Sequence, residues 1–109
     1  MDGLTAGRIV LFGLGVDPAG RIAERPAIVV RVWDNGGCNL QVFTDGNNDD
    51  AFLRPDETSA RDDRRRARSV VWRTSVQPVD RYDVAQVDRW RWPPRAVAAP
   101  RTADEARHG

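Results

Sequence analysis

The residue types that most often perform catalysis are scarce in this sequence and do not form a catalytic pattern. The chain contains one histidine, His108, and one cysteine, Cys38. A Ser-His-Asp or Cys-His arrangement needs a histidine held beside the nucleophile, and His108 lies in a polar C-terminal stretch. A structural zinc site needs four ligands, mostly His and Cys. We therefore predict no catalytic residue and no zinc site.

Two short motifs approach known ligand-binding loops without completing them. Gly13-Leu14-Gly15 is too short for a dinucleotide-binding fingerprint and does not open a predicted helix. Residues 45–50, DGNNDD, gather oxygen ligands but lack the spacing and terminal Glu of an EF-hand loop. Asp and Asn in such a turn commonly hydrogen-bond to their own backbone, which is how we interpret this stretch. The sequence thus predicts no cofactor and no metal.

An arginine run is the sharpest charged feature. Residues 61–68, RDDRRRAR, hold five Arg and two Asp, a net charge of +3 (5 − 2). Such a basic loop could follow a phosphate backbone, through Arg64, Arg65, Arg66 and Arg68. Against this, residues 45–57 just before it are acidic, and no aromatic residue is interleaved for base stacking. The alternatives are a solvated loop with partly paired charges, or an arm that docks onto another subunit.

Composition and patterning narrow the class further. The formal net charge is +1, so no overall field draws the chain to nucleic acid or anionic lipid. There is no signal-peptide pattern and no apolar run long enough to cross a membrane. We expect a soluble protein made in the cytoplasm, with no membrane partner. Cys38 begins a predicted strand, where it suits a small buried apolar side chain.

Residues 26–46, PAIVVRVWDNGGCNLQVFTDG, predict a central β-hairpin. β-rich runs at 27–33 and 38–44 flank an Asp-Asn-Gly-Gly turn that tolerates positive φ. Pro26 is predicted to begin the first of these strands, after a loop over 14–25. Further strands are predicted over residues 7–13, 69–76 and 88–92. Five short strands without an amphipathic helix predict an all-β fold, a small, partly open SH3-like barrel, with an OB-type barrel as the second choice.

The chain divides into a barrel domain over residues 1–94 and a tail over 95–109. The barrel carries a long polar insert at 45–68, and a connection of this length is usually functional, mobile or ordered by something else. The tail is rich in Ala, Arg and Pro and cannot bury enough surface to offset its ordering entropy. We therefore predict an extended or disordered tail.

The large apolar residues of the hairpin predict two faces. Strict alternation puts Ile28, Val30 and Val32 on one face of the first strand and Leu40 and Val42 on one face of the second. Trp33 and Phe43 fall on the opposite faces. A small barrel has one interior, so one of these two sets should lie near the surface.

Aromatic residues and arginine suggest a partner surface. Arg31 shares a face with Trp33, a combination common at protein interfaces. Trp90 and Trp92 share a face of the last strand, where they either cover the open end of the barrel or form an apolar patch for a partner. The candidate partner-binding residues are Arg31, Trp33, Phe43, Arg64, Arg65, Arg66, Arg68, Trp90 and Trp92.

Four segments together resemble a family of small proteins encoded by tailed phages and prophages. They are PAIVVRVW (26–33), NLQVFTDG (39–46), Trp72 with Thr74-Ser75-Val76, and WRWP (90–93). The resemblance implies a virion structural role, such as capsid decoration or a minor head component, after synthesis in the host cytoplasm. It implies other virion proteins as partners, the major capsid protein above all, and it transfers no active-site residue. The insert over 47–68 and the tail after Pro94 depart from the family's compact form.

A second likeness is to MazF/PemK-type toxins, which are SH3-like barrels that cleave RNA. It rests on Gly7-Arg8-Ile9-Val10 and on RPAIVV (25–30). It would cast Arg25 and Thr74 as participants, although no downstream motif matches, and a shared fold does not fix function. We expect a non-enzymatic virion protein that binds other proteins and that could also self-associate. A nucleic-acid-binding barrel and an RNase toxin are the alternatives.

Overall fold

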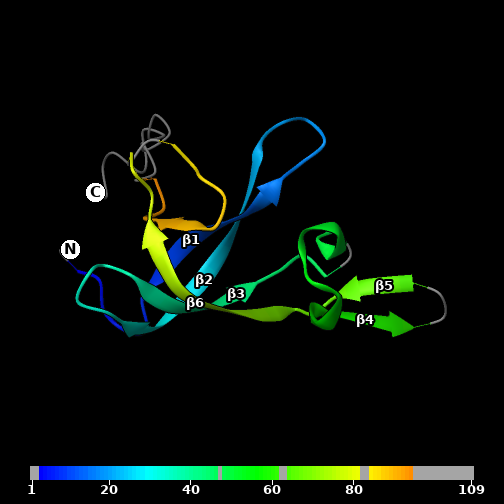
Figure 1. Cartoon of the computed structure of the whole chain (residues 1–109), viewed down its shortest axis with the longest axis horizontal. Helices are drawn as coiled ribbons and strands as arrows, with labels where there is room; N and C mark the ends of the chain where they lie inside the picture. Colours follow the sequence, from blue (N-terminus) through cyan, green and yellow to red (C-terminus); the bar gives the residue numbers. More distant parts are fainter. Residues whose placement is uncertain (1–2, 47, 62–63, 82–83, 95–109) are drawn as a thin grey trace, which may run out of the picture.

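A computed structural model of the chain shows five strands closed into a β-barrel, with almost no helix (Figure 1). This confirms the prediction of an all-β, five-stranded barrel. The structure describes residues 3–46, 48–61, 64–81 and 84–94, so the predicted tail at 95–109 lies outside the described residues. The strand order around the barrel is β1-β2-β3-β6-β7. The bounds are β1 Ile9–Val16, β2 Ile22–Val32, β3 Cys38–Phe43, β6 Val70–Pro78 and β7 Arg89–Arg91.

The short strand β7 closes the ring. It pairs antiparallel with β1 at Leu11 and Phe12, and parallel with β6 at Gln77 and Pro78. Because β7 meets β6 only at these last two residues, the first part of β6 has no strand on that side. Side chains and the insert fill the gap instead, and they create the pocket described below.

The first hairpin is longer than the sequence predicted, and the predicted loop at 14–25 is wrong. β1 continues to Val16 and β2 begins at Ile22. The Asp17 carboxylate shapes the turn between them by accepting the backbone N–H groups of Ala19 and Arg21, both at 2.9 Å. Pro26 therefore lies inside β2, not at its start. Pairing of β2 with β3 begins only at Ala27, so a missing N–H at Pro26 interrupts no ladder with β3.

A β-bulge interrupts the alternation of β2. Alternation predicted Ile28, Val30 and Val32 on one face, but the register to β3 shifts between Val29 and Arg31. Before the bulge, Ala27 and Val29 point into the core and Val30 lies outside, whereas Val32 after it lies opposite the buried Cys38 and packs against the core. A bulge adds one residue to one strand, so the two-residue period cannot continue across it. The single-face prediction therefore holds for Ile28 and Val30 and is wrong for Val32. Leu40 and Val42 share one face as predicted, and that face is the interior.

The core fills the barrel and places one candidate residue inside. The Trp90 side chain is 1% exposed, and its indole Nε1 donates a hydrogen bond to the Gly36 carbonyl at 3.1 Å. Trp92 packs edge-to-face on it, with ring centroids 5.5 Å apart. Trp90 is thus a core residue with no surface to offer a partner. The other fully buried side chains include Val10, Phe12, Val29, Cys38, Leu40 and Val42.

The polar insert at 45–68 has structure of its own. It forms two short 3-10 turns, η1 Asp50–Phe52 and η2 Pro55–Glu57, and a two-stranded hairpin, β4 Thr58–Arg61 with β5 Arg64–Ala67. Figure 1 shows this hairpin extending away from the barrel. The sequence did not predict the hairpin, because its strands lack the alternation of apolar and polar residues that marks a half-buried strand.

Candidate functional site

A row of four side chains crosses the outside of the barrel from β1 to β6. Ile9 lies opposite Ile28, Ile28 opposite Gln41, and Gln41 opposite Trp72. Directly opposed residues of neighbouring strands share one face of a sheet. Ile9 is 47% exposed and Trp72 is 44% exposed. Three of the four side chains in this outward-facing row are therefore apolar.

Further apolar side chains extend the row along the strands. Phe43 lies opposite Val70 on the same outer side, and each is 38% exposed. Val30, at the bulge, is also exposed. Isolated exposed apolar residues are ordinary on protein surfaces, but a set gathered on one sheet face marks an interaction site more often. We call this set the outer apolar face: Ile9, Ile28, Val30, Phe43, Val70 and Trp72.

A cation and a tryptophan lie at the β2–β3 turn end of this face. The Arg31 guanidinium carbon stacks 4.2 Å from the centroid of the Trp33 ring. The Trp33 indole Nε1 donates to Asn39 Oδ1 at 3.2 Å, and Asn39 Oδ1 also accepts the Ser75 N–H at 2.9 Å. The structure thus joins Arg31 and Trp33, as their shared predicted face suggested. No carboxylate in the described part of the chain pairs with Arg31.

The remaining predicted arginines lie on the insert. Arg68 is exposed, two residues before Val70, and its carbonyl accepts a hydrogen bond from the Thr44 hydroxyl. Arg64, Arg65 and Arg66 lie on β5 in the hairpin that extends from the barrel, and their side chains lie outside the described set. The structure therefore brings Arg31, Trp33, Phe43 and Arg68 to the outer face or its border, but not the arginines of β5.

The sequence analysis missed the centre of this face. Trp72, Val70 and Ile9 alternate correctly in their predicted strands, so their outward direction could be read. Their meeting on one surface depends on the register between strands, which alternation within a single strand does not specify.

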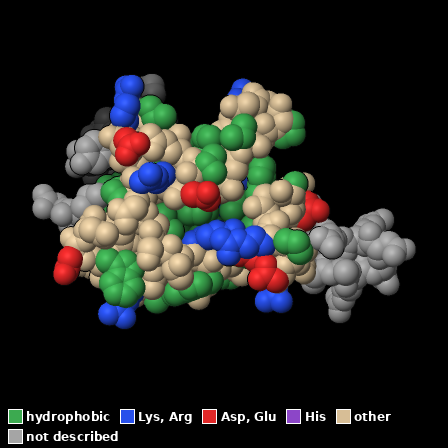
Figure 2. Space-filling view, in the orientation of Figure 1, with side chains coloured by type: hydrophobic (Ala, Val, Ile, Leu, Met, Phe, Trp, Pro, Cys, Tyr) green, Lys and Arg blue, Asp and Glu red, His purple; other side chains and the backbone are tan. Residues whose placement is uncertain are grey.

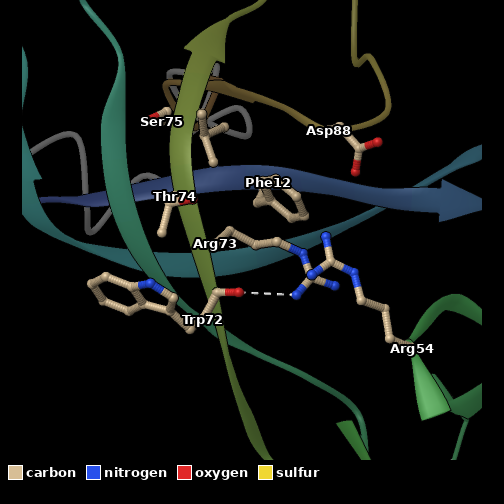
Figure 3. Close-up of a pocket in the computed structure, with 8 residues that line it drawn as sticks. Phe12, Arg54, Trp72, Arg73, Thr74, Ser75 and Asp88 are labelled. Carbon is tan, nitrogen blue, oxygen red and sulfur yellow. Dashed lines mark hydrogen bonds between the residues drawn. The ribbon is translucent and has the colours of Figure 1, made fainter. Parts of the chain in front are cut away.

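A pocket of about 280 Å³ opens where β6 lacks a neighbouring strand (Figure 3). Arg54 and Arg73 both point their guanidinium groups into it, and the Asp88 side chain lies near the Phe12 ring. Figure 2 shows basic side chains bounded by acidic ones near the centre of this side of the molecule. The lining residues are Phe12, Arg54, Trp72, Arg73, Thr74, Ser75, Val76 and Asp88.

Glu57 holds the two arginines of the pocket. Both of its carboxylate oxygens accept from the Arg73 guanidinium, with the Nη2–Oε1 distance at 3.0 Å, and Oε1 also accepts the Arg54 backbone N–H at 3.0 Å. Burial acts to raise the pKa of Glu57. The hydrogen bonds from Arg73 and Arg54 and the charges of both lower it by more, so the pKa lies below its ordinary value of 4.5. Glu57 is therefore ionised near neutral pH.

Two strained backbone positions border the same pocket. Among the described residues, positive φ outside glycine occurs at Ser75, with φ 52°, and at Asp88, with φ 60°. Such conformations cost of order 1–3 kcal/mol each and tend to cluster at functional sites. Both residues line the pocket. The strain therefore points to the pocket as a second candidate site.

The residues implied by the toxin likeness do not form one site. Two Arg25 nitrogens donate to Asp49, with Nε–Oδ2 at 2.7 Å and Nη2–Oδ1 at 2.6 Å, and the third, Nη1, donates to the Glu24 carbonyl at 2.8 Å. The hydrogen bond to Asp49 raises the Arg25 pKa despite partial burial. Thr74 lines the pocket, whereas Arg25 is not among its lining residues. Asp49 accepts the Asp45 N–H at 2.7 Å, which is the own-backbone hydrogen bond predicted for the DGNNDD stretch, but it is also fully buried and anchors Arg25.

Other functional features were tested on the described residues. No group of three or more His, Cys, Asp or Glu within the described ranges is placed to hold a metal ion. Cys38 is buried, as the sequence predicted, and burial raises the pKa of its thiol to about 11. Over residues 3–46, 48–61, 64–81 and 84–94, no helix has the length and apolar character needed to cross a bilayer.

No family model, curated protein or solved structure matches this chain. Neither the phage resemblance nor the toxin likeness gains support from these comparisons.

Proposed function

We propose that this protein is a non-enzymatic binding module that docks onto another protein through the outer apolar face. More specifically, we propose that it is a structural component of a phage virion, either a capsid decoration protein or a minor head component. The observation that carries the docking proposal is the outward row from Ile9 through Ile28 and Gln41 to Trp72. The virion setting is supported by the sequence resemblance at residues 26–33, 39–46 and 90–93.

The size of the face favours repeated, individually weak contacts. The face consists of six apolar side chains, and burying one such side chain fully contributes about 1.5–3 kcal/mol. Association itself costs about 4–15 kcal/mol in lost freedom and ordering. One copy would therefore bind modestly. A shell with many equivalent positions offsets this, because a binder with two contacts gains from effective concentration.

The charges of the face favour a different protein over a second copy as the partner. Two arginines, Arg31 and Arg68, border the outer apolar face, and Glu24 does not neutralise them because it is bound by Arg91. Arg31 lies at the turn end of the face, and Arg68 lies close to Val70 at the opposite end. A two-fold contact between two copies would place arginine against arginine in either orientation, which is unfavourable. The partner should instead present an apolar surface flanked by carboxylates.

The test is incorporation into virions. Tagged protein is expressed in the strain that encodes it, particles are purified by density gradient, and their proteins are quantified by mass spectrometry. We expect many copies per particle. Trp72→Ser and Phe43→Ser should lower incorporation at least tenfold, because a large buried aromatic side chain is typically worth more than 1.4 kcal/mol.

Val16→Ser is the matched control. Val16 is equally apolar and exposed but lies at the tip of the first hairpin, outside the outer apolar face. It should incorporate like the parent protein. Absence of the protein from virions, together with a monomer in sedimentation, would refute the virion proposal. Equal losses for Val16→Ser and Trp72→Ser would refute the assignment of the docking face.

A further inference from the structure

We propose that the pocket beside β6 binds a small zwitterion, namely an α-amino acid with an apolar side chain. Arg54 would bind its carboxylate and Asp88 its ammonium group. Trp72 belongs both to the outer apolar face and to the lining of this pocket. Arg54 and Asp88 are not part of that face, so the inference does not depend on docking. It rests on three features of the pocket: its charge balance, the separation of its opposite charges, and the strain at its border.

The charge balance comes first. Two arginines and one carboxylate, Arg54, Arg73 and Asp88, line the pocket, and a second carboxylate, Glu57, binds Arg73 beside it. Arg73 is already neutralised, because both oxygens of Glu57 bind its guanidinium. No carboxylate in the described part of the chain pairs with the Arg54 guanidinium, and no cation there pairs with Asp88. One positive and one negative group therefore remain for a ligand, and their sum is zero.

A net charge of zero selects against simple anions. A phosphate group would be attracted by Arg54 but repelled by Asp88 in the same small space. A ligand that carries both charges satisfies both side chains and leaves the pocket neutral. An Arg guanidinium presents a rigid fork that fits a carboxylate, and a carboxylate such as Asp88 accepts hydrogen bonds from an ammonium group.

The two opposite charges are held apart by their own segments. Asp88 is fixed before β7 by its N–H, which donates to the Gly13 carbonyl at 2.8 Å. Arg54 is fixed at the start of η2, where its N–H donates to Glu57. Figure 3 shows the Arg54 and Arg73 guanidinium groups on one side of the Phe12 ring and the Asp88 carboxylate on another. This is the arrangement that a bridging ligand would complete.

The strained backbone at the border of the pocket fits a binding site that is preorganised for its ligand. Asp88 and Ser75 adopt positive φ although neither is glycine, and backbone in this conformation is enriched at functional sites. The pocket volume of about 280 Å³ lies near the lower limit of about 300 Å³ for small-molecule sites, so it suits a single amino acid. Phe12 and Val76 supply apolar lining for its side chain.

The test removes one charge at a time from ligand and protein. Leucine and phenylalanine are titrated into the full chain, and binding is followed by ¹H–¹⁵N NMR at the Ser75 and Asp88 amides. The amino acid amides lack the carboxylate, and the N-acetyl amino acids lack the ammonium group. We expect each loss to weaken binding at least tenfold in the parent protein.

The variants assign each charge to its partner. In Arg54→Gln, the amide should bind as well as the free amino acid, because the group that senses the carboxylate is gone. In Asp88→Asn, the N-acetyl form should bind as well as the free amino acid. Arg54 and Asp88 are both exposed, so these variants should fold. Arg21→Gln, an exposed arginine in the first hairpin turn, is the control and should bind like the parent protein.

Two results would overturn the inference. One is the absence of saturable binding by either leucine or phenylalanine to the parent protein. The other is an equal weakening in all three proteins: the amide or N-acetyl form would bind more weakly than the free amino acid by the same factor in the parent, Arg54→Gln and Asp88→Asn proteins. Neither result bears on virion incorporation, so this inference and the docking proposal fail separately.

Discussion

Replacing Asp49 with Asn should release the insert from the barrel. The Asp49 carboxylate is fully buried and accepts three hydrogen bonds: from Arg25 Nε at 2.7 Å, from Arg25 Nη2 at 2.6 Å and from the Asp45 N–H at 2.7 Å. Asn keeps the shape but loses the charge, and its NH₂ group cannot accept from arginine.

The expected cost follows from burial. Removing one partner of a buried ion pair typically costs about 3–5 kcal/mol, because the other charge is left uncompensated. The Arg25 side chain is 26% exposed, so water can recover part of that loss. We therefore expect a loss near the lower limit, about 3 kcal/mol in the free energy of unfolding. For a domain of this size, that loss lowers Tm by about 12–24 °C.

Guanidinium denaturation followed by tryptophan fluorescence measures this loss. Asp50→Asn is the control, because Asp50 is the neighbouring carboxylate and takes no part in the Arg25 contact; it should change stability by less than about 0.5 kcal/mol. Combining Arg25→Gln with Asp49→Asn in a double-mutant cycle should give a coupling energy above about 1.5 kcal/mol. A coupling energy near zero, or Asp49→Asn as stable as the parent protein, would refute the reasoning.

Three further predictions test other parts of the structure. The pKa of Glu57 is lower in the folded chain than in the unfolded one. Its ion pair with Arg73 therefore stabilises the fold fully above about pH 4.5, and this stabilisation is lost as the pH falls through the folded pKa. Glu57→Gln should flatten the acid limb of a stability–pH profile, and an unchanged limb would contradict the assignment. Gly13→Ala should destabilise by about 2–3 kcal/mol in the same denaturation assay, because an added Cβ would lie 1.9 Å from the Gln86 carbonyl oxygen; a neutral effect would show that the backbone there can move apart. Cys38, buried and with a thiol pKa of about 11, should resist iodoacetamide at neutral pH and react only in denaturant; rapid labelling of the native protein, read by mass spectrometry, would exclude this burial.

Local sequence signals determined the barrel. The Asn-Gly-Gly turn and the alternation at 38–44 predicted the central hairpin, and its turn is closed by the Gly36 N–H donating to the Trp33 carbonyl at 3.1 Å. Turn residues and strand periodicity act within a few residues of one another, so they can be recognised without knowing the rest of the fold. The absence of long amphipathic segments likewise predicted an all-β protein.

The same local rules failed where a strand departs from regular geometry. The bulge near Val29 and Arg31 places Val32 on the core side, although Ile28 and Val30 before it lie on the outer side. A bulge is defined by two residues facing one on the partner strand, and no residue type in β2 marks that position. Alternation therefore predicted the strand but not its buried side.

Only the tertiary structure decided the two candidate sites. The outer apolar face needs the register of four strands, because Ile9 and Trp72 meet only through Ile28 and Gln41. The pocket takes Arg54 from the insert, Arg73 from β6 and Asp88 from the segment before β7. The sequence alone determined which segments become strands, since hydrogen-bonding geometry and side-chain period are local. Which side chains share a surface follows from strand pairing over long separations, and that is fixed only when the barrel closes.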